Sequence, residues 1–229
     1  MFFIKYIILI AVILVLFILL SHYIDYTRIN QEINIQQSEH PNNHIIDIML
    51  AKKQPTIFRY ELELWDGYDL LIGQQYEDII DVLKNNKLLE TNVQKIYLKP
   101  YELPLTKKWN IKCHKILKTW EEQDNMPIYE DNFLHLIACF SGIATICLIS
   151  PKHKNDINKL NNTKLSKEQK YKNFKKELES NSDKYEHISI PLRPCNMIYI
   201  PYGWFYYIYS GKVGEYCALF DAKCITYLN

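Results

Sequence analysis

The sequence has few glycines, six among 229 residues, and it lacks the glycine-rich motifs that serve nucleotide binding or acyl transfer. The P-loop, the G-x-G-x-x-G pattern and the G-x-S-x-G pattern are all missing. An excess of charge is missing too, because 27 Lys and Arg residues stand against 26 Asp and Glu residues, for a net charge of +1. A nucleic-acid-binding protein that works through a strong positive field is therefore not expected.

Metal-binding spacings are also missing. No two of the six cysteines form a C-x-x-C pair, and the seven histidines form neither H-x-D nor H-x-H. A zinc site is therefore not indicated. Four cysteines lie in or beside apolar runs, where a cysteine usually packs as a small hydrophobic side chain, and disulfides are the alternative in an oxidising compartment. These four are Cys139, Cys147, Cys195 and Cys217.

Ile, Asn, Lys and Tyr are abundant, which is typical of AT-rich coding sequence and would suit a large DNA virus or a parasite. The first long feature is an apolar run from Phe2 to Leu20, interrupted by one charged residue, Lys5. As a helix this run would be roughly 28 Å long, close to the bilayer core of about 30 Å. A cleaved signal peptide is the alternative, but the run ends in FILLSH, a poor cleavage site. We predict an uncleaved anchor over residues 1–22 that enters the lipid bilayer through residues 2–20.

The orientation of this anchor is marked by few charges. Lys5 and the α-amino group precede the span, and Arg28 is the only Lys or Arg within ten residues after it. The positive-inside rule then predicts a single-pass protein with a cytosolic N-terminus. On the opposite side of the membrane, Asn161 in the triplet Asn-Asn-Thr would be an N-glycosylation acceptor, although such triplets also arise by chance in an Asn-rich chain.

Residues 23–50 are polar and rich in Asn and Gln, and we expect them to form a linker or stalk. After them, residues 55–65 alternate apolar and polar side chains, which predicts a strand. Two helices are expected next, one around residues 76–83 and one over residues 106–122. The second prediction rests on an apolar stripe of Trp109, Cys113, Ile116 and Trp120.

From residue 132 onward, short apolar segments alternate with Gly, Pro and Ser, which predicts a sandwich or barrel of short strands. The segments are NFLHLIACF, ATICLIS, HISIPL, NMIYIP, WFYYIYS and EYCALFDAKCITYL. Residues 152–187 interrupt this pattern with ten Lys and six Asp or Glu. A capping-box pattern at Ser166–Gln169 predicts a short helix within this insertion, and its charges are expected to face solvent rather than lipid or nucleic acid.

Three motifs together resemble the JmjC and cupin-like domain family of iron(II)/2-oxoglutarate oxygenases. The stretch MIYIPYGWFY, residues 197–206, resembles the closing motif G-D-x-[IVL]-[FY]-I-P-x-G-W-W-H. The stretch from Gly142 to Pro151 resembles the strand G-x-K-x-[WF]-x-L-[FI]-x-P, with Ala144 in place of the basic residue. The stretch PIYED, residues 127–131, stands where the family has P-L-H-x-D, eleven residues before Gly142.

The resemblance implies an α+β, mainly β fold. Residues 51–229 would form a double-stranded β-helix, a cupin-like barrel with flanking helices, preceded by the single transmembrane helix. Active members of the family hold iron through two His and one carboxylate. Here Tyr129 replaces the first His, Asp131 is kept, and Tyr206 replaces the second His. Because a phenol with a pKa of about 10 is a poor ligand for ferrous iron, no cofactor is expected.

Other histidines are not expected to take over as ligands. His135 lies four residues after Asp131, about 13 Å along a strand, which is too far for shared coordination. His114 falls in the predicted helix and His187 falls outside the motif. Each is expected to be a structural or surface residue.

We therefore predict a single-pass membrane protein whose degenerate, metal-free cupin-like domain is a binding or structural module for an unknown protein or small molecule. The first alternative is a diverged oxygenase that uses Asp131 with Fe(II) and 2-oxoglutarate. The second is a module without redox chemistry that binds a sugar-like ligand or a small cation. The candidate pocket for that ligand is lined by Tyr129, Asp131, Trp204 and Tyr206.

Overall fold

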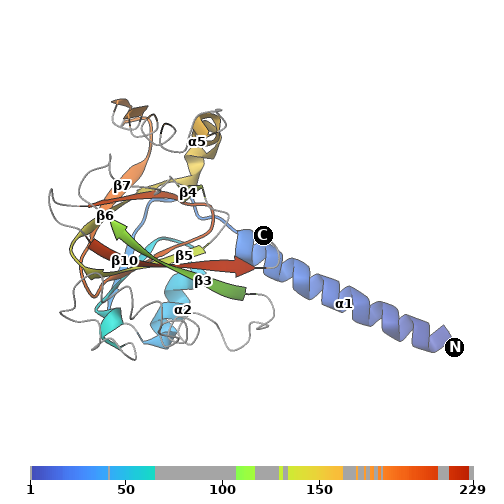
Figure 1. The fold of residues 1–229 in the computed structure, drawn as a ribbon. Coiled ribbons are helices and arrows are strands. Elements are labelled where there is room, and N and C mark those ends of the chain that lie inside the picture. Colours follow the sequence, from blue (N-terminus) through green and yellow to red (C-terminus); the bar gives the residue numbers. More distant parts are fainter. Residues whose placement is uncertain are drawn as a thin grey trace.

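The computed structural model describes residues 2–40, 42–64, 107–116, 129–130, 134–161, 169, 173, 176–177, 180–181, 183–210 and 217–226. The helices among them are α1 (Phe2–Thr27), α2 (Asn43–Ala51) and α5 (Lys154–Asn161), with 3-10 turns η1 (Glu61–Leu64) and η3 (Pro151–His153). Helix α1 projects away from a body of β-strands to which the other helices are attached (Figure 1). The described part of the chain is thus an α+β structure.

Ten described strands form two sheets. The strands are β1 (Gln36–Glu39), β2 (Thr56–Arg59), β3 (Lys107–Ile116), β4 (Tyr129–Glu130), β5 (Leu134–Ser141), β6 (Ala144–Ile149), β7 (His187–Leu192), β8 (Met197–Ile200), β9 (Phe205–Ser210) and β10 (Cys217–Thr226). The larger sheet has the order β1-β2-β8-β5-β10-β3 and the smaller sheet the order β4-β9-β6-β7. Among the described strands, every pair is antiparallel except β1 with β2.

The strand pairs are nested along the chain. Strand β3 pairs with β10, β4 with β9, β5 with β8 and β6 with β7, and these pairs belong alternately to the larger and the smaller sheet. Two further pairs, β5 with β10 and β6 with β9, complete the two sheets. The charged insertion, with η3 and α5, therefore lies at the innermost turn of this arrangement, between β6 and β7.

The core consists of apolar side chains from both sheets. Alternate residues of each strand enter it, as the two-residue period of a strand requires: Ile137 and Cys139 on β5, and Ile146 and Leu148 on β6. The remaining members include Ile190, Leu192, Ile198, Ile200, Trp204, Tyr206, Ile208 and Leu219. Removal of this apolar surface from water is the main term that stabilises the pair of sheets.

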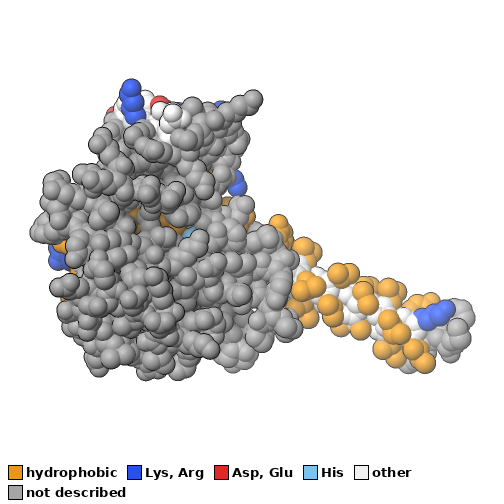
Figure 2. Space-filling model, viewed as in Figure 1, with side chains coloured by type: hydrophobic (Ala, Val, Ile, Leu, Met, Phe, Trp, Pro, Cys, Tyr) orange, Lys and Arg blue, Asp and Glu red, His pale blue; other side chains and the backbone are white. Residues whose placement is uncertain are grey.

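Helix α1 is the one described helix that is long and apolar enough to cross a membrane, over Ile4–Asp25. Its large apolar side chains are between 43% and 69% exposed, because no other described element covers them. Figure 2 shows these side chains around the projecting helix. A helix that is apolar on every side is suited to an apolar medium such as the interior of a bilayer.

The segment 23–50, expected to be a linker, holds regular structure. Helix α1 continues to Thr27, and β1 pairs with β2 in parallel. Helix α2 begins where the Asn42 side chain accepts a hydrogen bond from the Ile45 amide at 2.9 Å. Ile33 and Ile35 pack against the core, so this segment is part of the β body.

The helix predicted over residues 106–122 is wrong, because residues 107–116 form strand β3, which pairs with β10 in an unbroken ten-residue register. The expected strand at 55–65 is found as β2, followed by η1. The six strands predicted after residue 132 are all present, as β5 to β10. The helix expected at 76–83 lies outside the described residues, as does most of the one expected after Ser166.

Replacement of Ile146 by Ala tests the core. Ile146 is fully buried in β6, an interior strand of the smaller sheet, so Ile146→Ala should lower the free energy of unfolding by about 2–5 kcal/mol. The matched control is Ile45→Ala on α2, where the side chain is 39% exposed and a loss of about 1 kcal/mol or less is expected. Urea unfolding of the full chain in mild detergent measures both values. Equal losses at the two positions would contradict the described core.

Candidate functional site

Of the three positions that correspond to metal ligands in the resembled family, the structure describes Tyr129 and Tyr206 and brings them together. Tyr129 on β4 and Tyr206 on β9 are direct backbone partners in the smaller sheet. Directly paired residues in an antiparallel ladder have Cα atoms about 4.5–5.5 Å apart. The sequence predicted that these two positions belong to one site, and the register places them side by side. Asp131 lies outside the described residues.

A tight turn positions the aromatic residues of β9. Strand β8 ends at Ile200, and the Trp204 amide donates a hydrogen bond to the Pro201 carbonyl at 3.4 Å. Between them Gly203 has a φ of +86°, and a Cβ atom there would lie 2.8 Å from Cδ1 of Ile29. The glycine therefore serves both the left-handed backbone and the close approach of the segment after α1.

Tyr206 has a partner that the sequence analysis did not assign to it. The Tyr206 hydroxyl lies 3.0 Å from Nδ1 of His135 on β5, within hydrogen-bonding distance, and the donor depends on the imidazole tautomer. The two rings meet edge to face, with centroids 5.1 Å apart. Since β9 and β5 belong to different sheets, this hydrogen bond crosses the core.

Both members of the Tyr206–His135 pair are almost completely buried, each with 1% of its surface exposed. A buried polar group without a partner costs about 1–3 kcal/mol, so the two side chains stabilise each other in this apolar setting. His135 was expected to be structural or on the surface, and the structure makes it structural. The signal in the sequence was a lone polar residue in the apolar run NFLHLIACF, which requires a buried partner if the strand is covered.

Trp204 is held by the segment that follows α1, residues 28–35, which we call the strap. The indole Nε1 of Trp204 donates a hydrogen bond to the Asn30 carbonyl at 3.1 Å. The fully buried Ser150 at the end of β6 donates its hydroxyl to the Gln31 carbonyl at 2.7 Å. Ile29 contacts the Gly203 position. The strap is thus bound to both strand ends at which the family-like motifs lie.

Two members of the candidate pocket, Trp204 and Tyr206, are described with their side chains, and both are buried. Trp204 and Tyr206 are each 1% exposed and belong to the core cluster, so neither presents a ring face to solvent. For Tyr129 the structure gives the backbone position only. Within the described ranges, no group of three or more His, Cys, Asp or Glu could hold a metal ion.

The other residues that the sequence analysis singled out are cysteines, His187 and Asn161. The Cys139 thiol donates to the Gly142 carbonyl at 3.6 Å, and Cys147 is a buried thiol whose pKa is raised by burial, as expected for small packed side chains. His187 opens β7, exposed, and its Nδ1 lies 2.8 Å from the Tyr185 carbonyl. Asn161 is the last residue of α5.

A double-mutant cycle tests the buried pair. Tyr206→Phe removes the hydroxyl and with it the buried hydrogen bond to Nδ1 of His135, so the free energy of unfolding should fall by about 1–3 kcal/mol. Tyr60→Phe is the matched control, because that ring is 42% exposed, and its effect should stay within about 0.5 kcal/mol. In the background His135→Leu, Tyr206→Phe should have a smaller effect, with a coupling free energy above about 0.5 kcal/mol in urea unfolding. Additive losses would mean that the hydrogen bond does not contribute.

Comparison of the sequence with protein-family models and with curated protein sequences finds no match. The functional conclusion therefore rests on the geometry of the described residues and on the motifs that the sequence carries.

Proposed function

We propose that the chain is a single-pass membrane protein whose β body is a metal-free double-stranded β-helix that serves as a binding or structural module. The membrane part of the proposal rests on α1, whose apolar side chains no described element covers. The predicted cytosolic position of the N-terminus rests on Lys5 and stays a prediction.

The nested strand pairs support the double-stranded β-helix. An antiparallel ribbon that winds helically places its successive paired segments alternately in two facing sheets. The pairs β3–β10, β4–β9, β5–β8 and β6–β7 alternate between the sheets in this manner. The contacts β5–β10 and β6–β9 would then join successive turns of the winding. This is the arrangement that the resemblance to the cupin-like family implies.

The observation that carries the metal-free proposal is the buried hydrogen bond between Tyr206 and His135. For Tyr206 to ligate iron, its oxygen would have to leave His135 and its phenol would have to lose a proton. A phenol has an ordinary pKa of about 10, and burial disfavours the charged form further. The pair therefore favours a packed core at the position where active members of the family hold a metal.

The two alternatives draw less support from the described residues. A sugar-binding site presents an aromatic ring face to its ligand, whereas Trp204 and Tyr206 are buried and bonded to Asn30 and His135. A diverged oxygenase would depend on Tyr129 and Asp131, and no described contact favours it. The module proposal uses only interactions that the described residues make.

Restoration of the missing ligands tests the proposal. The full chain in detergent, incubated anaerobically with ferrous iron and 2-oxoglutarate, should retain no stoichiometric iron by elemental analysis. The double variant Tyr129→His/Tyr206→His would supply two imidazoles beside the retained Asp131, and it should gain about one iron per chain. Further substitution of Asp131→Ala in that variant should abolish the gain.

Each result has a separate meaning. Iron bound by the unmodified chain and lost on Asp131→Ala would overturn the metal-free proposal and favour the diverged oxygenase. A folded double variant without iron, with a cooperative unfolding transition, would show that positions 129, 131 and 206 do not correspond to the ligand positions of the family.

A further inference from the structure

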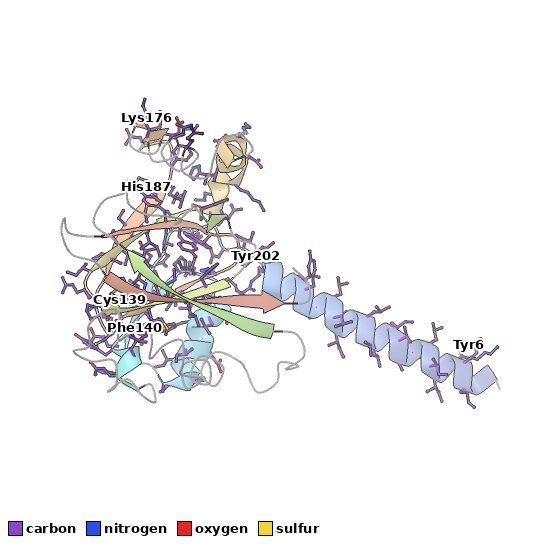
Figure 3. The ribbon with its side chains drawn as sticks, in the orientation of Figure 1. Tyr6, Cys139, Phe140, Lys176, His187 and Tyr202 are labelled. Carbon is purple, nitrogen blue, oxygen red and sulfur yellow. The ribbon has the colours of Figure 1, made fainter. Side chains whose placement is uncertain are left out.

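The end of α1 and the strap residue Arg28 meet the β body at two places, the C-terminal end of α2 and the turn between β8 and β9. Asp25 of α1 forms an ion pair with Lys53, which follows α2, with Oδ2 and Nζ 3.5 Å apart. Arg28 donates from Nη2 to the Ala51 carbonyl at the end of α2, at 2.6 Å. Tyr202, in the turn between β8 and β9, lies where α1 meets the β body (Figure 3). The junction between α1 and the β body is therefore held by side-chain contacts as well as by the chain itself.

Electrostatics of Tyr202 agree with this placement. Burial raises the pKa of the Tyr202 phenol, and the nearby Tyr23 phenol raises it further. Figure 3 shows Tyr202 where α1 meets the β body, and Lys176 on the part of the body remote from that junction. Tyr202 is partly exposed, whereas its neighbour Trp204 is buried. Tyr202 thus presents part of its ring beside the end of the apolar helix.

The physical chemistry of a bilayer sets the depth of this junction. The ion pair of Asp25 with Lys53 does not belong in the hydrocarbon core, where charged groups are strongly disfavoured. It belongs in the headgroup layer, which adds roughly 5–8 Å on each side of the hydrocarbon. Tyrosine is enriched at this depth because its ring is apolar and its hydroxyl is polar. Tyr23 and Tyr202 have the chemistry that this layer favours.

We propose that the surface formed by Arg28, Lys52, Lys53 and Tyr202, here called the anchor face, rests on phospholipid headgroups. This inference depends on the proposed function, namely on α1 crossing the bilayer. Arg28 and Lys52 are exposed and positively charged, and they would face lipid phosphates. Lys53 forms its ion pair with Asp25 and so lies beside the end of α1. The anchor face adjoins the apolar surface of α1, so the membrane that α1 would cross is also the partner of the anchor face.

Site-specific photo-crosslinking of the full chain in nanodiscs of phosphatidylcholine and phosphatidylserine tests this surface. The photoreactive residue p-benzoylphenylalanine is placed in separate variants at Ile10, Tyr202, Lys52 and Lys176. Ile10, in the middle of α1, reports on the membrane span itself. Lys52 is exposed and tolerates the larger side chain if position 202 does not. Lys176 is the control, exposed and remote from the junction.

Mass spectrometry of the irradiated chains should find lipid adducts at Ile10, Tyr202 and Lys52, and at most a tenth of that yield at Lys176. Adducts at Ile10 without adducts at Tyr202 or Lys52 would overturn the anchor face and leave the membrane anchor intact. No adduct at Ile10 would overturn the membrane anchor, and with it this inference.

A linker insertion separates contact through the junction from chance proximity to lipid. A flexible Gly/Ser insertion between Thr27 and Arg28 keeps α1 in the bilayer but removes the geometric constraint that holds the β body against it. The adducts at Tyr202 and Lys52 should then fall several-fold, whereas those at Ile10 should remain. Unchanged adducts at Tyr202 would mean that the fixed junction does not set the contact, and would overturn that part of the inference.

Discussion

The hydrogen bond between Tyr206 and His135 meets the main constraint on this β body, which is that polar groups buried between the two sheets need partners. Two sheets can bury their apolar faces against each other only if every polar group between them finds a partner. His135 and Tyr206 lie on strands of different sheets, and each satisfies a polar atom of the other in the apolar interior. Tyr206 can therefore pack in the same apolar cluster as Ile137, Ile200 and Ile208, because its hydroxyl bonds to His135.

The strap likewise provides partners for buried polar groups, at the end of β6 and at the start of β9. Trp204 brings an N–H group and Ser150 brings a hydroxyl into buried positions, and the backbone carbonyls of Asn30 and Gln31 accept from them. Apolar contacts hold the strap in place, since Ile33 and Ile35 pack on the core and Ile29 occupies the space that Gly203 leaves. The strap, which was expected to be a linker, thus supplies backbone acceptors for two donors of the β body.

Much of the strand pattern could be predicted from the sequence, because short apolar runs bounded by Gly, Pro and Ser are typical of strands and are too short for most helices. The run HISIPL became β7 without a change of bounds, and Tyr129 and Tyr206, which the resemblance assigned to one site, are backbone partners. Strand β3 was misread because KKWNIKCHKI carries two periods: Trp109, Cys113 and Ile116 suit a helix, whereas Trp109, Ile111 and Cys113 suit a strand. Pairing with β10, which is distant in sequence, decides between them. The contacts of His135 and of the strap were beyond prediction for the same reason, since local sequence does not specify which distant carbonyl or ring will be the neighbour.

These contacts join α1 to the centre of the β body over very few residues. From Asp25, paired with Lys53, the chain needs only five residues to reach Asn30, which holds the indole of Trp204. Two residues beyond Trp204 lies Tyr206, bonded to His135 in the opposite sheet. Of the hydrogen bonds along this path, the one between Tyr206 and His135 is buried and therefore costly to break. Trp204 and Tyr206, which the sequence singled out as candidate pocket residues, are thus members of a series of contacts that runs from the end of α1 into the core.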